Sequence, residues 1–304
     1  MIPGEAQQLP LEKEYAKDTG ITPEDIKKLR EWINNQPHLP SQYITDLDLI
    51  LAYHCCERST AVTKQVIDLH YTLKTLFNIF KDRTIADGRI ERALNTTLFQ
   101  PLPMRSRDGY ACMYCRIVDT NTKNFVYADA VKIALMILDL WQYEEGTWPG
   151  YMFVVDLQTM SAGHLACLEI QVIQQFFYFV QEALLVKLKG MHFMNAPSFM
   201  DKLMMLIKPF LKKELLDKLH IHQPGSMDLD KFISMEALPK DAGGNYKSVD
   251  ECREDISRKI LANKSFFEAE SLKRVCESRR PGKPKTVTDF FGGVEGSFKK
   301  LDID

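Results

Sequence analysis

Two cysteines, three histidines and one aspartate have residue types and spacings that could support catalysis or metal binding. Cys112 and Cys115 have the C-x-x-C spacing of redox and zinc sites. They lie in a stretch, Tyr110 to Val118, whose alternation of residue types predicts a strand. Residues three apart on a strand point to opposite faces, and no second cysteine pair follows. We therefore interpret both thiols as core residues.

The three histidines lie in two short apolar stretches. His220 and His222 share one face of a predicted strand, and His192 belongs to the predicted strand before it. Three imidazoles could hold a zinc ion, although buried histidines more often have a structural role. We expect no metal at this place.

Asp156 ends a buried apolar stretch, a position where acids often take part in catalysis. No base or nucleophile lies beside it in the sequence, and the chain has no G-x-S-x-G motif. The glycine-rich run that starts at Gly292 lacks the Lys-Ser/Thr of a phosphate loop. We therefore expect a protein that is not an enzyme and has no catalytic cofactor.

Composition narrows the class of protein further. The chain has 304 residues, 45% of them hydrophobic, and a net charge of -2. This balance argues against a nucleic-acid-binding protein, which would carry a strongly basic surface. The N-terminal residues do not resemble a secretory signal, no apolar run reaches 18 residues, and the seven cysteines are an odd number at irregular spacing. We expect a soluble cytoplasmic protein with reduced thiols.

The first part of the chain has the periodicity of helices, and the part after it contains predicted strands that alternate with helices. Thr22 and Asp46 mark the starts of two helices, and a third is predicted from Thr60 to Lys81. A polar connector is predicted for 82–108. Strands at 110–118, 151–157 and 191–194 then alternate with helices at 127–140 and from about Ser161, which predicts a mixed or parallel sheet covered by helices. We expect a charged surface helix over 249–277. The tail after it is either a flexible end or docked onto the domain through Phe290, Phe291 and Phe298.

The stretch from Met191 to His222 is the one around which the other predicted elements are arranged. It contains a helix, from about Phe199, that is hydrophobic nearly all round and should bend or stop near Lys208, because Pro209 lacks a backbone N–H. Such a helix can be core, partner contact, or a lid between an apolar cavity and a membrane. Residues 187–218 also hold seven lysines and three acids, a local net charge of +4. This excess favours an anionic surface as a partner.

The same stretch resembles a known family. Asn195-x-Pro197, the run Ile207 to Leu211, His220-x-His222 and the turn Leu238 to Gly244 are similar to motifs of the CRAL-TRIO lipid-binding family. The run from Arg280 to Lys285 and the one from Phe291 to Leu301 resemble tails of its insect alpha-tocopherol-transfer-protein-like branch. The resemblance implies an α/β fold with an N-terminal helical bundle (1–85), a lipid-binding domain (86–250) with a sheet floor and a mobile apolar lid helix, and a C-terminal helix and tail (251–304).

The resemblance also implies a site. We expect one small hydrophobic ligand, such as a tocopherol, retinoid or carotenoid, between the sheet and the lid. The expected floor residues are Val154, Leu157, Met191 and Phe193, with Ile170 and Ile173, and the expected lid residues are Phe199, Leu203, Leu206, Ile207, Phe210 and Leu211.

A basic cleft for phosphoinositide head groups is implied beside the lid. Lys187, Lys189 and Lys218 match basic positions of that cleft, whereas Glu214 stands where a lysine is expected. The basic residues of an N-terminal helix are also missing near His54. We therefore expect phosphoinositide binding that is weaker or altered.

Two functions from different classes remain open at this point. The first is a carrier that moves its ligand between membranes by opening the lid at an anionic surface. The second is a phosphoinositide-binding trafficking adaptor with little lipid transfer. An isomerase that acts on a bound retinoid is a more distant third.

Overall fold

A five-stranded sheet forms the centre of the computed structural model, which describes residues 4–86 and 88–292. The strand order is β1-β2-β3-β4-β5, with β1 antiparallel to β2 and all later neighbours parallel. The predicted mixed sheet with an α/β fold is therefore confirmed. The bounds are β1 (Thr97–Pro101), β2 (Ala111–Ile117), β3 (Tyr151–Asp156), β4 (Leu188–Met194) and β5 (Leu219–Ile221).

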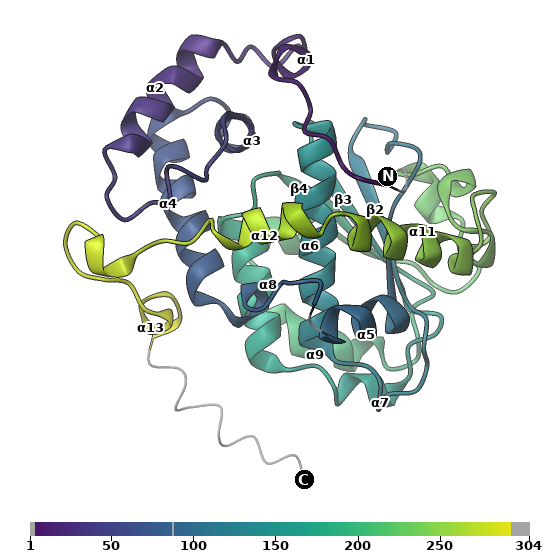
Figure 1. Cartoon of the computed structure of the whole chain (residues 1–304). Coiled ribbons are helices and arrows are strands. Elements are labelled where there is room, and N and C mark those ends of the chain that lie inside the picture. The colour runs from purple at the N-terminus through teal and green to yellow at the C-terminus, as the bar shows by residue number, and fades with distance from the viewer. Residues whose placement is uncertain (1–3, 87, 293–304) are drawn as a thin grey trace.

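Helices α1 to α4 form the N-terminal bundle, shown in purple to blue in Figure 1. Thr22 caps α2 by accepting a hydrogen bond from the Asp25 amide, while the Asp25 carboxylate accepts one from the Thr22 amide. Thr45 and Asp48 form the same reciprocal cap at α3. The predicted starts of these two helices are confirmed. The bounds are α1 (Leu11–Tyr15), α2 (Pro23–Asn34), α3 (Asp46–Cys55) and α4 (Thr60–Leu76).

The region predicted as a polar connector is structured instead. The third helix ends at Leu76 and a short 3-10 turn, η1 (Asn78–Phe80), follows it. The segment 82–108 then contains α5 (Gly88–Thr96) and the edge strand β1. The connector prediction was wrong because three apolar side chains of α5, Ile90, Ala93 and Leu94, share one helix face that packs into the core.

Helices α6, α8 and α9 cover one face of the sheet. The helix predicted from Ser161 is two pieces, α7 and α8, separated by a turn at 166–169. The lid helix ends at Ile207 and continues as the 3-10 turn η2, where Pro209 predicted a bend or stop. The bounds are α6 (Tyr127–Glu145), α7 (Ala162–Leu165), α8 (Ile170–Glu182), α9 (Met200–Ile207), η2 (Lys208–Phe210) and α10 (Lys213–Leu216).

The opposite face of the sheet is covered by the segment after β5 and by α11, which passes across the strands in Figure 1. The predicted surface helix over 249–277 is broken at Asn263. Its first half packs into the core on one side, because Cys252, Ile256 and Ile260 are buried there. The bounds are η3 (Asp228–Lys231), η4 (Met235–Ala237), η5 (Lys240–Ala242), α11 (Val249–Ala262) and α12 (Lys264–Ser271).

Charged contacts join the N-terminal bundle to the rest of the molecule. The ammonium group of Lys74 on α4 lies 3.4 Å from Asp139 of α6 and 3.3 Å from Glu270 of α12. Lys273 pairs with Asp48 at 2.7 Å and also with Glu270. Because these groups are largely buried, each ion needs its partners to remain charged away from water. The network therefore fixes the bundle against α6 and α12.

The chain then returns to the bundle through η6 (Glu277–Arg279) and α13 (Val287–Phe291). Phe291 stacks on Phe77, the residue after α4, at 5.4 Å between ring centroids, and Phe290 packs against Tyr178 of α8 at 5.9 Å. The docked alternative is therefore confirmed for these two phenylalanines. Phe298 lies outside the described residues.

None of the helices in the described part of the chain combines the length and the apolar character needed to cross a bilayer.

Candidate functional site

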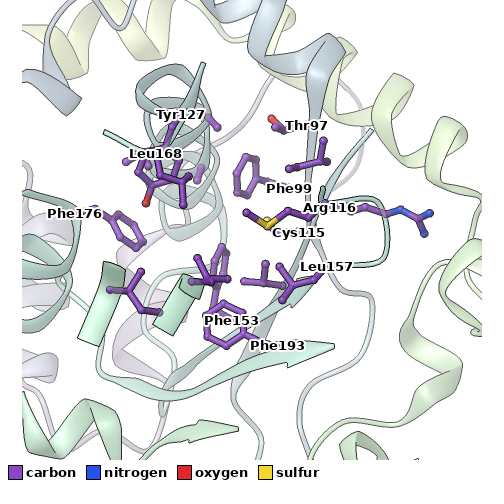
Figure 2. Close-up of a pocket in the computed structure, with 18 of the residues that line it drawn as sticks. Thr97, Phe99, Cys115, Arg116, Tyr127, Phe153, Leu157, Leu168, Phe176 and Phe193 are labelled. Atoms are coloured by element: carbon purple, nitrogen blue, oxygen red, sulfur yellow. The ribbon is translucent and has the colours of Figure 1, made fainter. Parts of the chain in front are cut away.

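An apolar cavity of about 150 Å³ lies between the sheet and the helices α6, α8 and α9. Figure 2 shows its walls, with Phe99, Phe153, Phe176 and Phe193 among the labelled aromatic side chains. Twenty-three residues line it: Thr97, Phe99, Cys115, Arg116, Ile117, Phe125, Tyr127, Ala130, Val131, Ala134, Phe153, Val155, Asp156, Leu157, Met160, Leu168, Ile173, Phe176, Phe177, Met191, Phe193, Leu203 and Ile207.

The floor of the cavity follows the alternation of the strands. Along β3, Met152 and Val154 are fully buried while Phe153 and Val155 keep accessible surface. Because β3 is the central strand, that surface faces the cavity and not the outside of the protein. Met191 and Phe193 of β4 pair with Phe153 and Val155 and extend the same floor.

Two residues expected on the floor lie elsewhere. Val154 is fully buried on the opposite face of the sheet, since it differs by one position from the cavity residues Phe153 and Val155. Ile170 is half-buried at the first turn of α8 and does not reach the cavity wall. Leu157, Ile173, Met191 and Phe193 do line the cavity.

The walls come from one stripe of each covering helix. On α6 the wall residues Tyr127, Val131 and Ala134 are spaced four and three apart, so they share a face. On α8 Ile173 and Phe177 follow the same rule, with Phe176 beside them. Sequence reasoning missed the α6 residues, although their spacing in the printed sequence would have revealed the stripe.

The lid helix α9 has an inner and an outer face. Leu203 and Ile207 line the cavity, whereas Met205 on the outer face is 75% exposed. Of the three uses open to such a helix, burial on all sides does not describe α9, because Met205 is exposed. Leu211 is buried in the same apolar cluster as Leu203 and Ile207, and Leu206 and Phe210 are half-buried against it. Phe199 is half-buried and belongs neither to this cluster nor to the cavity wall.

The three lysines expected at a phosphoinositide site lie on neighbouring parts of the sheet. Lys187 and Lys189 flank the start of β4, and Lys218 immediately precedes β5. Lys187 forms an ion pair with Glu57, whose pKa is lowered by that contact. The Lys189 ammonium lies 5.9 Å from the centroid of the Tyr110 ring, and Lys218 donates to the Leu188 carbonyl at 3.3 Å. The patch is thus basic but partly neutralised by Glu57.

Further polar groups form hydrogen bonds on the opposite face of the sheet. Tyr114 donates to the Asp156 carboxylate at 2.6 Å and Asn195 donates to its second oxygen at 2.8 Å. Cys112 is buried on that face while Cys115 lines the cavity, as strand alternation predicts.

The histidines form a stack and not a chelating set. The ring of His192 lies 4.6 Å from that of His220 and 5.3 Å from that of His222, with interplanar angles of 14° and 12°. The Nδ1 atom of His192 lies 3.0 Å from Nε2 of His222, so one of these two nitrogens donates a hydrogen bond to the other and the pair is already engaged. Burial, with the nearby His220 and His222, lowers the pKa of His192 to about 3. Within the described residues, no group of three potential ligands is placed to hold a metal ion.

Comparisons with known proteins agree with the geometry. Residues 95–244 match the model of the CRAL/TRIO domain, and residues 20–90 match that of the Pinta-like UBA domain. Clavesin-1 of Mus musculus is 22% identical over 239 residues, which are 78% of this chain and 68% of that protein. The alpha-tocopherol transfer protein-like protein of Homo sapiens is 22% identical over 209 residues, which are 68% of this chain and 56% of that protein.

Among solved structures, Sfh5 aligns with a TM-score of 0.46 and 14% identity over 78% of this chain and 91% of that chain. The two family models cover the N-terminal bundle and the segment that contains the sheet, the cavity and α9. The protein therefore carries a CRAL/TRIO domain over residues 95–244.

Proposed function

We propose that this protein is a cytoplasmic carrier that holds one small hydrophobic ligand in the cavity and transfers it between membranes. The observation that carries the proposal is the apolar cavity closed by a short helix whose outer face exposes one large apolar side chain, Met205, among charged residues. CRAL-TRIO proteins are lipid-binding transfer proteins, and the name of one relative refers to tocopherol transfer. Tocopherol, retinoid and carotenoid are the ligand classes to test first.

The need for a carrier follows from the energetics of lipid exchange. Moving a lipid with about 20 buried carbons into water costs on the order of 16 kcal/mol, at about 0.8 kcal/mol per CH₂. A cavity of about 150 Å³ holds no more than a benzene-sized group. A larger ligand therefore requires the lid to move outward. The short helix α9, which contributes Leu203 to the cavity wall, separates the cavity from solvent.

The surface around the lid supports opening at a membrane. Met205 is exposed between Lys202 and Lys208, which are exposed as well. An anionic bilayer would attract the lysines and offer Met205 an apolar environment, so it would stabilise the open lid more than the closed one. Transient binding to the membrane surface, and not insertion across it, is the mode we propose.

The test measures transfer of a fluorescent tocopherol or retinoid between liposomes containing about 20% anionic lipid. We expect Leu203→Asp to abolish ligand retention, because a carboxylate would enter the cavity wall. Met205→Asp should retain the ligand and slow transfer about tenfold, because only the outer face changes. Met227→Asp is the matched control, since Met227 is 65% exposed outside the lid. Transfer by Met205→Asp at the rate of the unchanged protein would refute the lid mechanism.

The lysine patch favours a second function, a phosphoinositide-binding trafficking adaptor. In that case Lys187→Ala with Lys189→Ala should abolish recruitment to phosphoinositide liposomes while the purified protein carries no lipid. Because Glu57 pairs with Lys187, Glu57→Gln should strengthen the same recruitment. Organic extraction of the purified protein separates the two functions, since only the carrier should yield a stoichiometric lipid.

We also infer that the protein belongs to the insect tocopherol-transfer-like branch. The sequence of 280–285 and of 291–301 supports this placement, although the positions from 293 onward lie outside the described residues.

A further inference from the structure

The cavity wall contains very few polar side chains, and most of them are engaged elsewhere. The Asp156 carboxylate accepts from Tyr114 and Asn195 on the opposite face of the sheet. The Arg116 guanidinium lies 3.4 Å from that carboxylate, and Figure 2 shows it pointing away from the cavity. The Thr97 hydroxyl donates to the Ala93 carbonyl at 2.8 Å. None of these groups is left to donate to a ligand.

Tyr127 differs from them. It is the first residue of α6 and lines the cavity, and in the part of the chain that the structure describes its hydroxyl forms no hydrogen bond. The side chain keeps some accessible surface and is one of the residues that line the cavity. In Figure 2 Tyr127, Leu168 and Phe176 lie on one side of the cavity, opposite Arg116 and Leu157.

The Tyr127 hydroxyl remains a donor over the physiological pH range. Burial, with a smaller contribution from Cys115, raises the pKa of Tyr127. A hydroxyl in a protein wall that has no protein partner and little access to solvent makes fewer hydrogen bonds than it would in water. A ligand oxygen that accepts from it restores one bond at a fixed point of an otherwise apolar wall.

The same wall disfavours a charged ligand group. Among the described lining residues the one cation is Arg116, and its guanidinium is directed to Asp156 and to the Asp241 carbonyl. A carboxylate or phosphate inside the cavity would therefore have no counter-ion, and burying an unpaired charge is strongly unfavourable. Six phenylalanines on the wall favour flat rings or conjugated chains, which pack well against aromatic faces.

We infer that Tyr127 is the specificity-determining residue of this cavity and selects a neutral, largely hydrocarbon ligand with one oxygen acceptor, such as an alcohol or an aldehyde, over the acid of the same skeleton. This inference rests on the proposed carrier function.

The experiment compares ligands that share one carbon skeleton. The purified full-length protein is titrated at pH 7.4 with retinol, retinal and retinoic acid, and in parallel with α-tocopherol and oleic acid, by quenching of intrinsic fluorescence. We expect the neutral ligands to bind at least about tenfold more tightly than the acids. Tyr127→Phe removes only the oxygen and should weaken the neutral ligands about threefold to tenfold while leaving the weak acid binding unchanged.

Thr97→Val is the matched control, because it removes the other wall hydroxyl whose proton is already donated to Ala93. It should leave the order of ligand affinities unchanged. Circular dichroism of both variants verifies that they fold.

The outcomes separate the two proposals. If the unchanged protein binds none of the five ligands, the carrier proposal fails and this inference falls with it. If it binds them and Tyr127→Phe binds the neutral ligands equally well, or if the acids bind as tightly as the alcohol, the role of Tyr127 is refuted while the carrier function stands. A selective loss of neutral-ligand affinity in Tyr127→Phe alone establishes the inference.

Discussion

The two faces of the central sheet differ, although the same strands supply both. On one face Val154 is fully buried, and Tyr114, Asp156 and Asn195 are joined by hydrogen bonds. On the other, Phe153 and Val155 border an open apolar volume. The first face is closed by the long connection after β5 and by α11, and the second is closed partly by the short helix α9. The fully packed face gives the sheet a rigid support. The other face is only partly covered by side chains and borders a cavity whose volume can change.

The largest effect should come from the packed face, by removal of its buried carboxylate. Asp156→Ala leaves the Tyr114 hydroxyl and the Arg116 guanidinium without their partner in a site from which water is excluded. We expect the free energy of unfolding to fall by about 3–5 kcal/mol, as for other broken buried ion pairs. Urea unfolding followed by circular dichroism measures it.

Asp156→Asn is the control for that change, because an amide keeps an acceptor for Tyr114 at nearly the same shape. It should cost clearly less than the alanine. A loss below about 1 kcal/mol for Asp156→Ala would mean that the packed face does not depend on this carboxylate.

A pair of neighbouring valines compares the two faces directly. Val154→Ala opens a new void in the packed face and should lower the free energy of unfolding by about 2 kcal/mol. Val155→Ala only enlarges a cavity that exists already, so it should cost less than about 1 kcal/mol and alter ligand uptake. Equal losses of stability in urea unfolding would contradict the difference between the faces.

The smallest effect concerns acid sensitivity of the packed face. His192 has a pKa of about 3 in the folded protein against an ordinary value of 6.5, so the folded state favours the neutral ring. The stability that this ring contributes is complete above about pH 6.5 and is lost as the pH falls toward 3. Between pH 7.5 and 5.5 the loss is about 1.4 kcal/mol for one such group.

His192→Phe should therefore remove about 1.4 kcal/mol of that pH dependence. The aromatic ring preserves the contact with Phe232, while the hydrogen bond to His222 is lost at every pH. His70 is the comparison within the same chain, since burial also lowers its pKa to about 3 and it lies outside the stack. An unchanged slope in His192→Phe would show that His192 is not the group that titrates.

Local signals in the sequence were sufficient for much of the fold. Thr22 and Asp46 mark the starts of two helices, and Pro209 marks the end of α9, because these effects act within one helical turn. The strand β1 escaped prediction because an edge strand of five residues has little periodicity of its own. It becomes a strand through its pairing with β2, which is a tertiary contact.

The sequence also predicted part of the site, because residue spacing along a helix or a strand is a local feature. Leu203 and Ile207 are spaced one helical turn apart, so the inner stripe of α9 is a property of the sequence. Val154 and Leu157 were both expected on the floor, yet an odd spacing on a strand places them on opposite faces, a signal that was present in the sequence.

The sequence alone predicted an α/β domain and an apolar helix bordered by lysines, because periodicity, caps and composition are local quantities. Tertiary structure decided which face of the sheet is filled and which encloses a cavity. It also decided that Glu57 neutralises Lys187 and that the Tyr127 hydroxyl is left unpaired, since both depend on groups brought together from distant parts of the chain. A void is the space that packing leaves over, and no single segment encodes it.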